Sequence, residues 1–283
     1  MNHTGSNPTN LSQITTVAVI PARYASSRLP GKPLVDIAGK PMICWVAERA
    51  IAARNVDRVI VATDSEAIVE AVSKLGFDVV MTSESHTSGT DRVAEVARSI
   101  PDAKIFVNLQ GDEPLISPAT IERAVEQMRE ELSSANGAGI VTTWETIDSF
   151  DDLINPDLVK VVVGNDNRAA YFSRSPIPFP RDLIKKHGGF EPAYRHEPDF
   201  LKLFRKHTGL YVYRRDVLLA FTQWPQTQLE KIEALEQLRA LENGVVIKVI
   251  QASSPSTGVD TEQDLDRVRE LVDAGNFEPT AVR

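Results

Sequence analysis

Three basic side chains and several small polar residues lie close together in the segment 21–34, whose sequence is PARYASSRLPGKPL. Arg23, Arg28 and Lys32 fall within ten positions, and the segment contains no acidic residue. Guanidinium and ammonium groups neutralise phosphate charge, and a hydroxyl such as that of Ser26 can complete a cradle for phosphate oxygens. The segment therefore predicts a binding loop for a phosphorylated ligand, with a solvated basic turn as the alternative interpretation.

The same loop excludes two common nucleotide-binding motifs. It contains neither the GxxxxGK[ST] pattern of P-loop ATPases nor the GxGxxG pattern of Rossmann dehydrogenases. It follows the first predicted strand directly, and ligands of open α/β sheets bind beyond the carboxyl ends of the strands. We therefore expect a phosphate site of another type.

Two aspartates far apart in the sequence could supply a metal site beside this loop. Asp112 follows a predicted strand in the sequence QGDEP, and Asp260 precedes the last predicted helix. Mg²⁺ prefers a few carboxylates together with substrate phosphates over a complete protein cage. The two aspartates could therefore complete a site around a triphosphate. The alternatives are a turn residue for Asp112 and a helix N-cap for Asp260.

Alternating strands and helices must position these residues. In the first half of the chain, short apolar runs alternate with segments of helical periodicity, which is typical of βαβ units and a parallel sheet. Cys44, on the first of these helices, is expected in the core. We expect strands at 17–21, 58–62, 77–81 and 104–109, and helices at 41–53, 65–75, 89–100 and 118–132.

The second half has a less regular pattern. One helix is expected over 228–243, ending at Gly244, and a closing helix over 262–273. Between 180 and 208 no clear period is visible, so we expect an irregular surface segment there. Further strands are expected at 139–144, 159–163, 169–172, 209–214 and 245–250.

The composition is that of an ordinary soluble protein. The 283 residues include 31 basic and 39 acidic side chains, and the net charge of −8 argues against nucleic-acid binding. The single cysteine excludes an intrachain disulfide and a cysteine-based metal site. Because no long apolar run and no signal-like start occur, we expect a cytoplasmic protein without membrane contact. Residues 1–15, rich in Asn, Thr and Ser, are expected to form a flexible extension.

Seven motifs in this order resemble those of the sugar-acid cytidylyltransferases. The resemblance extends over about 17–272 and is strongest to the 3-deoxy-D-manno-octulosonate (Kdo) cytidylyltransferases, or CMP-Kdo synthetases. The segments that carry it are IPARYASSRLPGKPL at 20–34, VATD at 61–64, SGTDR at 88–92, NLQGDEP at 108–114, AYFSR at 170–174, LEQLR at 235–239 and GVDT at 258–261.

The resemblance implies an α/β fold like that of nucleotide-diphospho-sugar transferases. Its doubly wound, mostly parallel sheet would carry a smaller mixed α/β part for dimerisation and sugar binding. One nucleotidyltransferase domain would span 16–275, with an irregular insertion at about 182–206. The implied reaction joins CTP and Kdo to give CMP-Kdo and pyrophosphate for lipopolysaccharide biosynthesis. The resemblance also implies Mg²⁺ dependence, a cytosolic location and a homodimer.

Residue by residue, the resemblance implies a catalytic group and a nucleotide-binding group. The implied catalytic residues are Arg28, Lys32, Asp112 and Asp260, with both aspartates as magnesium ligands. The implied nucleotide-binding residues are Ala22, Arg23, Ser26, Lys32, Asp64, Ser88, Arg92 and Gln110. Without the resemblance, Ser88 would be interpreted as a helix N-cap and Gln110 as an ordinary loop residue.

The implied sugar-binding residues all lie in the second half. They are Arg174, Arg181, His207, Tyr211, Glu236 and Gln237. The two arginines suit the carboxylate of a sugar acid, because a planar guanidinium can bind it in a bidentate manner. Tyr211 could equally be a half-buried strand residue, and Glu236 part of an exposed helix face. The chain departs from the family after Thr261, where Glu262 and Gln263 replace the usual Pro and Glu, so the start of the last helix is less certain.

The implied mechanism is an in-line displacement at the α-phosphorus of CTP by the anomeric 2-hydroxyl of the sugar. One Mg²⁺ would lie on Asp112 and Asp260 and a second mainly on the phosphates, and no side chain stands out as a general base. Two alternatives stay open. The acceptor could be a related sugar acid, such as 8-amino-3,8-dideoxy-Kdo or a nonulosonic acid. The chain could also be a nucleotide-binding regulator without catalysis.

Overall fold

A computed structural model describes residues 15–24 and 29–275 of the chain. The predicted extension, up to residue 14, and the predicted site residues Ser26 and Arg28 lie outside the described residues. The remaining predicted site residues can all be placed in the fold.

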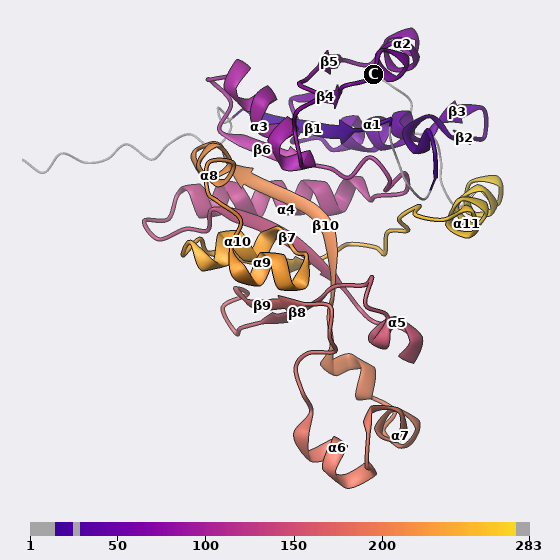
Figure 1. Ribbon diagram of the computed structural model, residues 1–283, viewed down its shortest axis with the longest axis vertical. Helices are drawn as coiled ribbons and strands as arrows, with labels where there is room; N and C mark the ends of the chain where they lie inside the picture. Colours follow the sequence, from indigo (N-terminus) through magenta and orange to yellow (C-terminus); the bar gives the residue numbers. More distant parts are fainter. Residues whose placement is uncertain (1–14, 25–28, 276–283) are drawn as a thin grey trace, which may run out of the picture.

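A large central sheet organises the molecule (Figure 1). Its strands are β1 Thr16–Ala22, β4 Arg58–Thr63, β5 Val79–Met81, β6 Ile105–Asn108, β7 Ile140–Glu145, β8 Lys160–Val163, β9 Ala169–Ser173, β10 Lys206–Arg214 and β11 Ile247–Gln251. Along the order β11-β7-β10-β6-β1-β4-β5, only β10 runs antiparallel to its neighbours, while β8 and β9 form an antiparallel pair beside β10. The predicted mostly parallel sheet is therefore confirmed.

Helices cover both faces of the sheet because the strands are apolar on both faces. On β1, Ala18 and Ile20 face one apolar cluster, and Val17 and Val19 face the other, as the alternation of a strand requires. The first cluster includes residues of α1 Met42–Ala52, α2 Glu66–Lys74 and α4 Pro118–Leu132. The second includes residues of α3 Gly89–Ser99, α8 Arg215–Phe221 and α10 Gln237–Glu242. The sheet is doubly wound, as predicted.

The prediction of one continuous helix over 228–243 is wrong. The structure contains two helices there, α9 Gln228–Glu233 and α10. Ala234 separates them in the left-handed region, with φ at 51°. Alanine is a good helix former and does not mark a break in the sequence, so the break is imposed by tertiary contacts. It turns the start of α10 toward the first turn of α3, where Glu236 accepts a hydrogen bond from Thr90.

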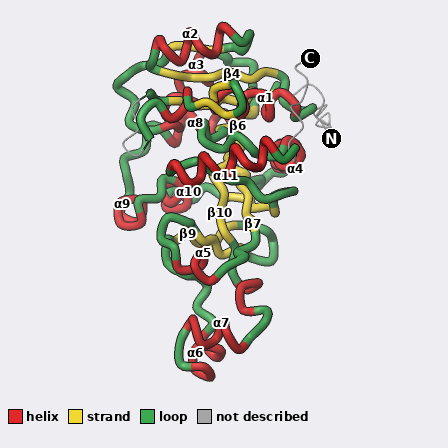
Figure 2. The backbone as a smooth tube through the Cα atoms, turned by 90° about the vertical axis from the view of Figure 1, so that its right-hand side faces the viewer, coloured by secondary structure: helices red, strands yellow, loops and turns green. Residues whose placement is uncertain are grey.

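The segment predicted to be irregular is instead largely helical. It contains α6 Arg181–His187, α7 Phe190–His196 and a 3₁₀ turn at Phe200–Leu203. These elements form an arm that projects from the sheet below β8 and β9 (Figures 1 and 2). The arm shares a small apolar core with residues 147–153, and this core includes Phe200 and Phe204. Helices this short carry too few turns to produce a readable period, which explains the wrong prediction.

Three further elements complete the fold, and the sequence analysis anticipated only the last of them. They are α5 Phe150–Ile154, the hairpin of β2 Asp36–Ile37 and β3 Lys40–Pro41, and α11 Glu262–Asp273. The helix α11 packs through Leu265 and Val268 against the hairpin and the start of α1. This packing brings the segment before α11, which contains Asp260, to Lys32 in the segment 21–34, which we call the phosphate loop.

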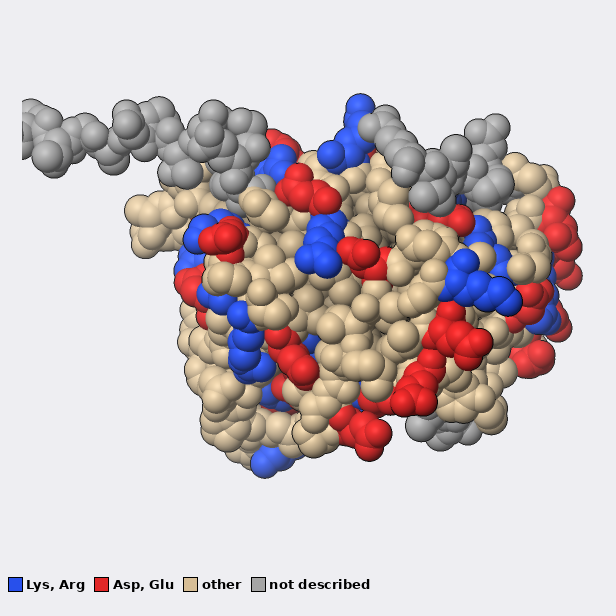
Figure 3. All heavy atoms as spheres, turned by 90° about the horizontal axis from the view of Figure 1, so that it is seen from above, with Lys and Arg blue, Asp and Glu red and all other residues tan. Residues whose placement is uncertain are grey.

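Burial and charge follow the expectations from composition. Cys44 is buried in the core, and burial raises the pKa of its thiol to about 11. Over the described ranges, no helix is both long and apolar enough to cross a lipid bilayer. Basic and acidic side chains are interspersed on the face seen in Figure 3.

Candidate active site

The candidate site lies where the parallel strands end. The loop that follows β1 contains Arg23, β4 ends just before Asp64, and β6 ends just before Gln110. Because the carboxyl ends of parallel strands meet at one edge of a sheet, these residues come from three separate segments to one region. The predicted position of the site in the fold therefore agrees with the strand order.

Lys32, Asp112 and Asp260 meet at this edge, as predicted from the sequence. The Lys32 ammonium lies 2.5 Å from Asp112 Oδ2 and 2.9 Å from Asp260 Oδ1. Lys32 stands at the start of a 3₁₀ turn, Lys32–Leu34, entered through Gly31 with φ at 67°. Burial lowers the pKa of Lys32, but the two carboxylates outweigh it and raise the pKa above its ordinary value. We call these three residues the phosphate side of the site.

Backbone contacts hold the two aspartates in place. The Val259 amide donates to the Asp112 carbonyl at 2.9 Å, which joins the loop after β6 to the segment before α11. The N-cap of α11 is Thr261, which forms a capping box with Asp264. The N-cap alternative for Asp260 is therefore wrong, and the start of the last helix is well formed despite its departure from the family pattern. The Asp260 carboxylate lies on Lys32 instead.

The chemistry of the phosphate side fits a hard divalent cation. Its two carboxylates share one ammonium and can therefore approach one ion. Within residues 15–24 and 29–275, no group of three or more His, Cys, Asp or Glu side chains is arranged to hold a metal. Two protein carboxylates completed by phosphate oxygens are the ligand set that Mg²⁺ commonly has at phosphate-transfer sites.

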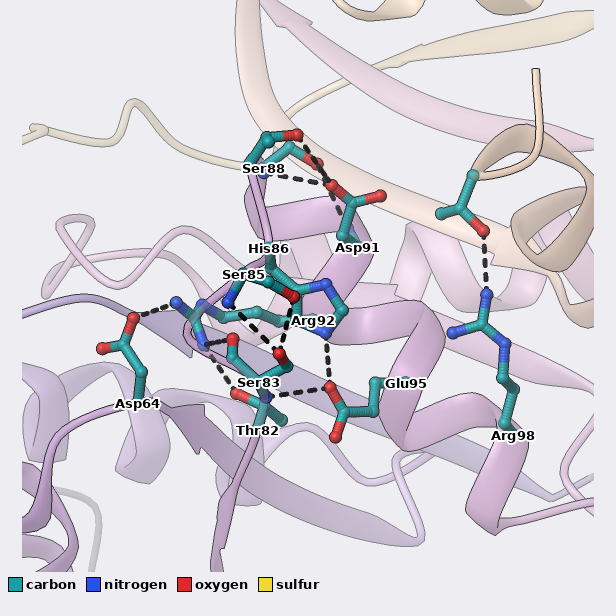
Figure 4. Close-up of polar contacts among 12 residues, drawn as sticks. Asp64, Thr82, Ser83, Ser85, His86, Ser88, Asp91, Arg92, Glu95 and Arg98 are labelled. Atoms are coloured by element: carbon teal, nitrogen blue, oxygen red, sulfur yellow. Dashed lines mark hydrogen bonds and ion pairs between the residues drawn. The ribbon is translucent and has the colours of Figure 1, made fainter. Parts of the chain in front are cut away.

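Asp64, Ser88 and Arg92 lie around the start of α3 in two separate sets of polar contacts, one between Arg92 and Asp64 and one between Ser88 and Asp91 (Figure 4). Arg92 is fully buried, pairs with Asp64 and donates to Thr82 Oγ1 at 2.7 Å. Ser88 caps α3 in a capping box with Asp91, so its N-cap interpretation is confirmed. The contacts that these residues make in the structure are with protein groups, and their contact with a nucleotide stays a prediction.

The other predicted nucleotide residues border the same edge. Ala22 is the buried last residue of β1. Arg23 Nη2 donates to the carbonyl oxygen of His86 at 2.8 Å. Gln110 Nε2 donates to the carbonyl oxygen of Gly209 on β10 at 3.4 Å. Gln110 thus lies between the phosphate side and the residues predicted to bind the sugar.

His207 and Tyr211 lie on β10 on either side of a bulge, and their rings are 5.4 Å apart. His207 Nε2 lies 2.9 Å from Thr142 Oγ1. Burial lowers the pKa of His207 to about 3, so its ring is neutral. Burial, Tyr213 and Glu236 raise the pKa of Tyr211 well above its ordinary value. Tyr211 is half-buried in a strand, in agreement with the alternative interpretation of its position.

Glu236 and Gln237 lie at the start of α10 and are not part of an exposed helix face. Glu236 Oε2 accepts a hydrogen bond from Thr90 Oγ1 at 2.7 Å, and burial raises the pKa of Glu236. Gln237 is buried. Glu236 and Ser88 both line a cavity of about 500 Å³ between the residues just before α3 and the helices α9 and α10. We call His207, Tyr211 and Glu236 the sugar side of the site.

The two arginines predicted to bind the sugar carboxylate, Arg174 and Arg181, lie in different environments. Arg174 donates from all three guanidinium nitrogens to backbone carbonyls, those of Glu233, Pro156 and Ala234. It therefore supports the break between α9 and α10. Arg181 is exposed at the start of α6 on the arm, with Asp182 3.6 Å away. The structure does not bring Arg181 together with the rest of the sugar side.

Glu113 is a residue that the sequence analysis missed. Burial and the charge of Asp112 raise its pKa to about 7, and Glu145, Lys206 and Ser256 also lie close enough to affect it. Its Oε2 atom is buried and forms no hydrogen bond within the described structure. Its place directly after Asp112 was the available signal, but burial of a carboxyl group in a loop cannot be seen in a sequence.

Comparison with known proteins gives consistent matches. A family model described as "Cytidylyltransferase" matches residues 17–250. The 3-deoxy-manno-octulosonate cytidylyltransferase of Trichlorobacter lovleyi is 47% identical over 261 residues, which are 92% of this chain and 99% of the relative. That of Geobacter metallireducens is 51% identical over 255 residues, which are 89% of this chain and 96% of the relative.

Solved structures agree with these matches. A structure of CMP:2-keto-3-deoxy-manno-octonic acid synthetase complexed with CTP is 41% identical and has a TM-score of 0.81. The match covers 92% of this chain and 99% of that one. A putative glucose-1-phosphate thymidylyltransferase from Bacillus anthracis, 17% identical with a TM-score of 0.63 over 93% and 98% of the two chains, shows a shared fold alone.

Proposed function

The chain belongs to the 3-deoxy-manno-octulosonate cytidylyltransferase family, and on this premise we propose that it transfers CMP from CTP to the anomeric hydroxyl of Kdo. The products are CMP-Kdo and pyrophosphate, and CMP-Kdo serves lipopolysaccharide biosynthesis. The observation that carries the proposal is the meeting of Lys32, Asp112 and Asp260 at the carboxyl ends of the strands. A triphosphate there would meet one ammonium and two carboxylates able to share a cation with it.

The reaction is an in-line displacement at phosphorus. The anomeric hydroxyl releases its proton to solvent and its oxygen forms a bond to the α-phosphorus. The bond from that phosphorus to the bridging oxygen breaks, and pyrophosphate leaves with the electron pair. Such a step depends on position and charge neutralisation more than on covalent help from the protein. Lys32 keeps its proton because its pKa is raised, so it can neutralise the triphosphate at any physiological pH.

We propose Mg²⁺ as the cofactor, held by Asp112 and Asp260. When bound, Mg²⁺ neutralises phosphate charge and lowers the pKa of a hydroxyl that it contacts. Lys32 would then exchange part of its contact with the two carboxylates for contact with the phosphates. Asp112 and Asp260 are half exposed, at 36% and 48%, so a ligand can approach both.

The two substrates would bind to groups of different character. Amide and hydroxyl groups, as on Gln110 and Ser88, can donate to and accept from a base edge and a ribose. The neutral His207 ring and the Tyr211 hydroxyl offer hydrogen bonds without charge, which suits the hydroxyls of a sugar acid. Glu236, in the wall of the cavity, can accept from hydroxyls.

We also propose a cytoplasmic homodimer. The arm and its base expose several large apolar side chains, including Phe179 at 61% and Leu203 at 45%. A second copy of the chain would remove this surface from water and stabilise the projecting arm. Sedimentation or light scattering of the full chain at two concentrations would measure the proposed state directly.

The test of the reaction is pyrophosphate release from CTP. Kdo, its 8-amino analogue and a nonulosonic acid are compared with Mg²⁺ present, each with an EDTA control. We expect EDTA-sensitive release that is fastest with Kdo. A preference for another acceptor would change the substrate and keep the mechanism. CTP binding without release from any acceptor would refute the catalytic proposal.

A further inference from the structure

The loop of residues 82–88, which connects β5 to α3, is held by two side chains of α3 (Figure 4). The transfer reaction itself does not explain why these two side chains hold the loop. Arg92 and Glu95 lie three positions apart on α3, which places them on one side of the helix. Both point toward this loop in Figure 4.

Arg92 fixes the beginning of the 82–88 loop. Its Nη1 atom donates to Thr82 Oγ1 at 2.7 Å and to the Ser83 carbonyl at 3.1 Å, and its Nη2 atom pairs with Asp64. Because Arg92 is fully buried, these contacts are protected from water. The beginning of the loop is thereby tied to the end of β4.

Glu95 fixes the middle of the loop. Its Oε2 atom accepts from the Ser83 amide at 3.1 Å and makes a short contact with His86 Nε2. Burial opposes ionisation of Glu95, but the Ser83 amide and His86 keep its pKa below the ordinary value. A charged carboxylate therefore holds the His86 ring, and with it the backbone of His86.

The carbonyl group of His86 is the link to the phosphate loop. It accepts a hydrogen bond from Arg23 Nη2 at 2.8 Å. The first turn of α3 also lies directly on the end of β1, since a Cβ atom at Gly89 would be 3.1 Å from Pro21 Cγ. The chain of contacts from Glu95 to the His86 ring, the His86 carbonyl and Arg23 thus ends at a residue predicted to bind the nucleotide.

We propose that His86 and Glu95 are positioning residues of the nucleotide site. The carboxylate fixes the imidazole, the imidazole fixes the backbone carbonyl of residue 86, and that carbonyl orients the Arg23 guanidinium toward CTP. The inference rests on the proposed function, because it takes CTP as the ligand of Arg23. It predicts that His86 and Glu95 act on CTP through Arg23 alone.

The test is a double-mutant cycle read by CTP binding. Calorimetry with CTP and Mg²⁺ compares wild type, His86→Ala, Arg23→Ala and the double variant. We expect each single substitution to raise the Kd for CTP about tenfold, as for the loss of one hydrogen bond to a charged group. We expect the double variant to bind CTP within about twofold of Arg23→Ala, because both changes remove one interaction.

Two further variants separate positioning from general stability. Glu95→Gln keeps the size of the side chain but removes the charge that holds His86, and should raise the Kd for CTP and the KM for CTP with little change in kcat. Arg98→Ala is the matched control, since Arg98 lies on the same helix and contacts Thr222 at 3.2 Å, away from the loop (Figure 4). It should leave the Kd for CTP unchanged.

The outcomes distinguish the inference from the proposed function. Additive losses for His86→Ala and Arg23→Ala, or an unchanged Kd for CTP in a folded Glu95→Gln, would overturn the inference. An unchanged Kd in Arg23→Ala would overturn it as well. Wild-type protein that binds CTP but releases no pyrophosphate would refute the transfer reaction, and the binding cycle would still decide the role of His86 and Glu95.

Discussion

The phosphate side and the sugar side of the candidate site hold their polar groups in opposite ways. On the phosphate side, Lys32, Asp112 and Asp260 are charged, and the two carboxylates are half exposed. On the sugar side, burial lowers the pKa of His207 to about 3 and raises the pKa of Tyr211 and of Glu236. The phosphate side therefore offers charge to a ligand, whereas the His207 ring and the Tyr211 hydroxyl of the sugar side offer hydrogen bonds without charge.

This difference matches what each substrate would need. A triphosphate brings several charges, and half-exposed counter-charges can rearrange around it at low cost because water still solvates them. A hydroxylated sugar needs hydrogen bonds that are already in place, and these are stronger where water is excluded. Substitutions on the phosphate side should therefore act mainly on turnover, and those on the sugar side mainly on binding and stability.

The largest effect is expected for Asp112→Asn. The substitution removes one of two carboxylates able to hold Mg²⁺, while the size of the side chain is kept. We expect kcat to fall by roughly 10²–10³-fold, equivalent to about 3–4 kcal/mol of transition-state stabilisation, with CTP binding largely kept. Pyrophosphate release and calorimetry with CTP measure the two quantities.

A surface carboxylate provides the control for Asp112. Asp78 is exposed and pairs with Arg58 at 3.0 Å, so Asp78→Asn should change neither quantity. Equal losses of turnover and of CTP affinity in Asp112→Asn would make Asp112 a binding residue. In that case substitutions on both the phosphate side and the sugar side would act mainly on binding, and the proposed difference between the two sides would be wrong.

The second-largest effect is expected for Gly209→Ala, because Gly209 lies in the β10 bulge between the phosphate side and the sugar side. A Cβ atom there would be 2.8 Å from Gln110 Cγ and 3.2 Å from Glu113 Oε1. The Gln110 and Glu113 side chains would have to shift, with a loss of about 1–3 kcal/mol in stability. We expect the KM values for CTP and for Kdo to rise together.

Gly258→Ala is the matched control for Gly209. Gly258 also lies near the phosphate side, but the nearest atom to a Cβ atom there is the Asp112 carbonyl oxygen at 4.0 Å. Steady-state kinetics and urea unfolding of both variants would measure the difference. A rise in only one of the two KM values for Gly209→Ala would mean that the bulge does not couple the two sides.

The phosphate side could be predicted from the sequence, and the sugar side only in part. Arg23 and Lys32 stand within a loop free of acidic residues, and Asp112 follows a strand of the regular βαβ half. Local charge and the common edge of parallel strands were sufficient to bring Lys32 and Asp112 together, whereas Asp260 reaches them through the packing of α11. The family resemblance added their roles, which the contacts alone do not specify.

The second half was harder because its structure depends on tertiary contacts. Ala234 breaks a helix that its residue type favours, and Arg174 supports that break through backbone carbonyls. The short helices of the arm carry no readable period. The burial that makes His207 neutral and raises the pKa of Glu113 arises only when distant segments pack together. None of these features has a local signature.

The third prediction concerns the pH dependence of stability through His207. The folded pKa of about 3 lies below the ordinary value of 6.5, so the unfolded chain takes up a proton that the folded protein does not. This contribution to stability is complete above pH 6.5 and is lost as the pH falls toward 3, by up to about 1.4 kcal/mol per pH unit. Glu113 has the opposite sign, because its folded pKa of about 7 lies above its ordinary 4.5.

Since the two groups oppose each other between pH 4.5 and 6.5, the test is a comparison of slopes. Wild-type protein and the His207→Gln variant are each unfolded in urea at pH 4.5 and at pH 6.5. The free energy of unfolding of His207→Gln should fall less on acidification than that of wild type. Parallel curves would mean that burial does not lower the pKa of His207 in the folded protein.

The smallest effect is expected for Arg181→Ala. The resemblance implies that Arg181 binds the sugar, but the structure places it on the arm with 78% of its side chain exposed and an ion pair to Asp182 at 3.6 Å. Loss of an exposed side chain with one weak ion pair should change the free energy of unfolding by less than about 0.5 kcal/mol. The KM for Kdo should change less than in a His207 variant.

Arg195→Ala is the control for Arg181, because Arg195 is similarly exposed on the arm and pairs with Glu191. Both variants should resemble wild type in urea unfolding and in kinetics with Kdo. A tenfold or greater rise in the KM for Kdo in Arg181→Ala alone would mean that Arg181 reaches the sugar. Since the arm projects from the sheet, that result would require the arm to close over a site, either its own or that of a second subunit (Figure 2). The sugar side would then gain a guanidinium group when the arm closes.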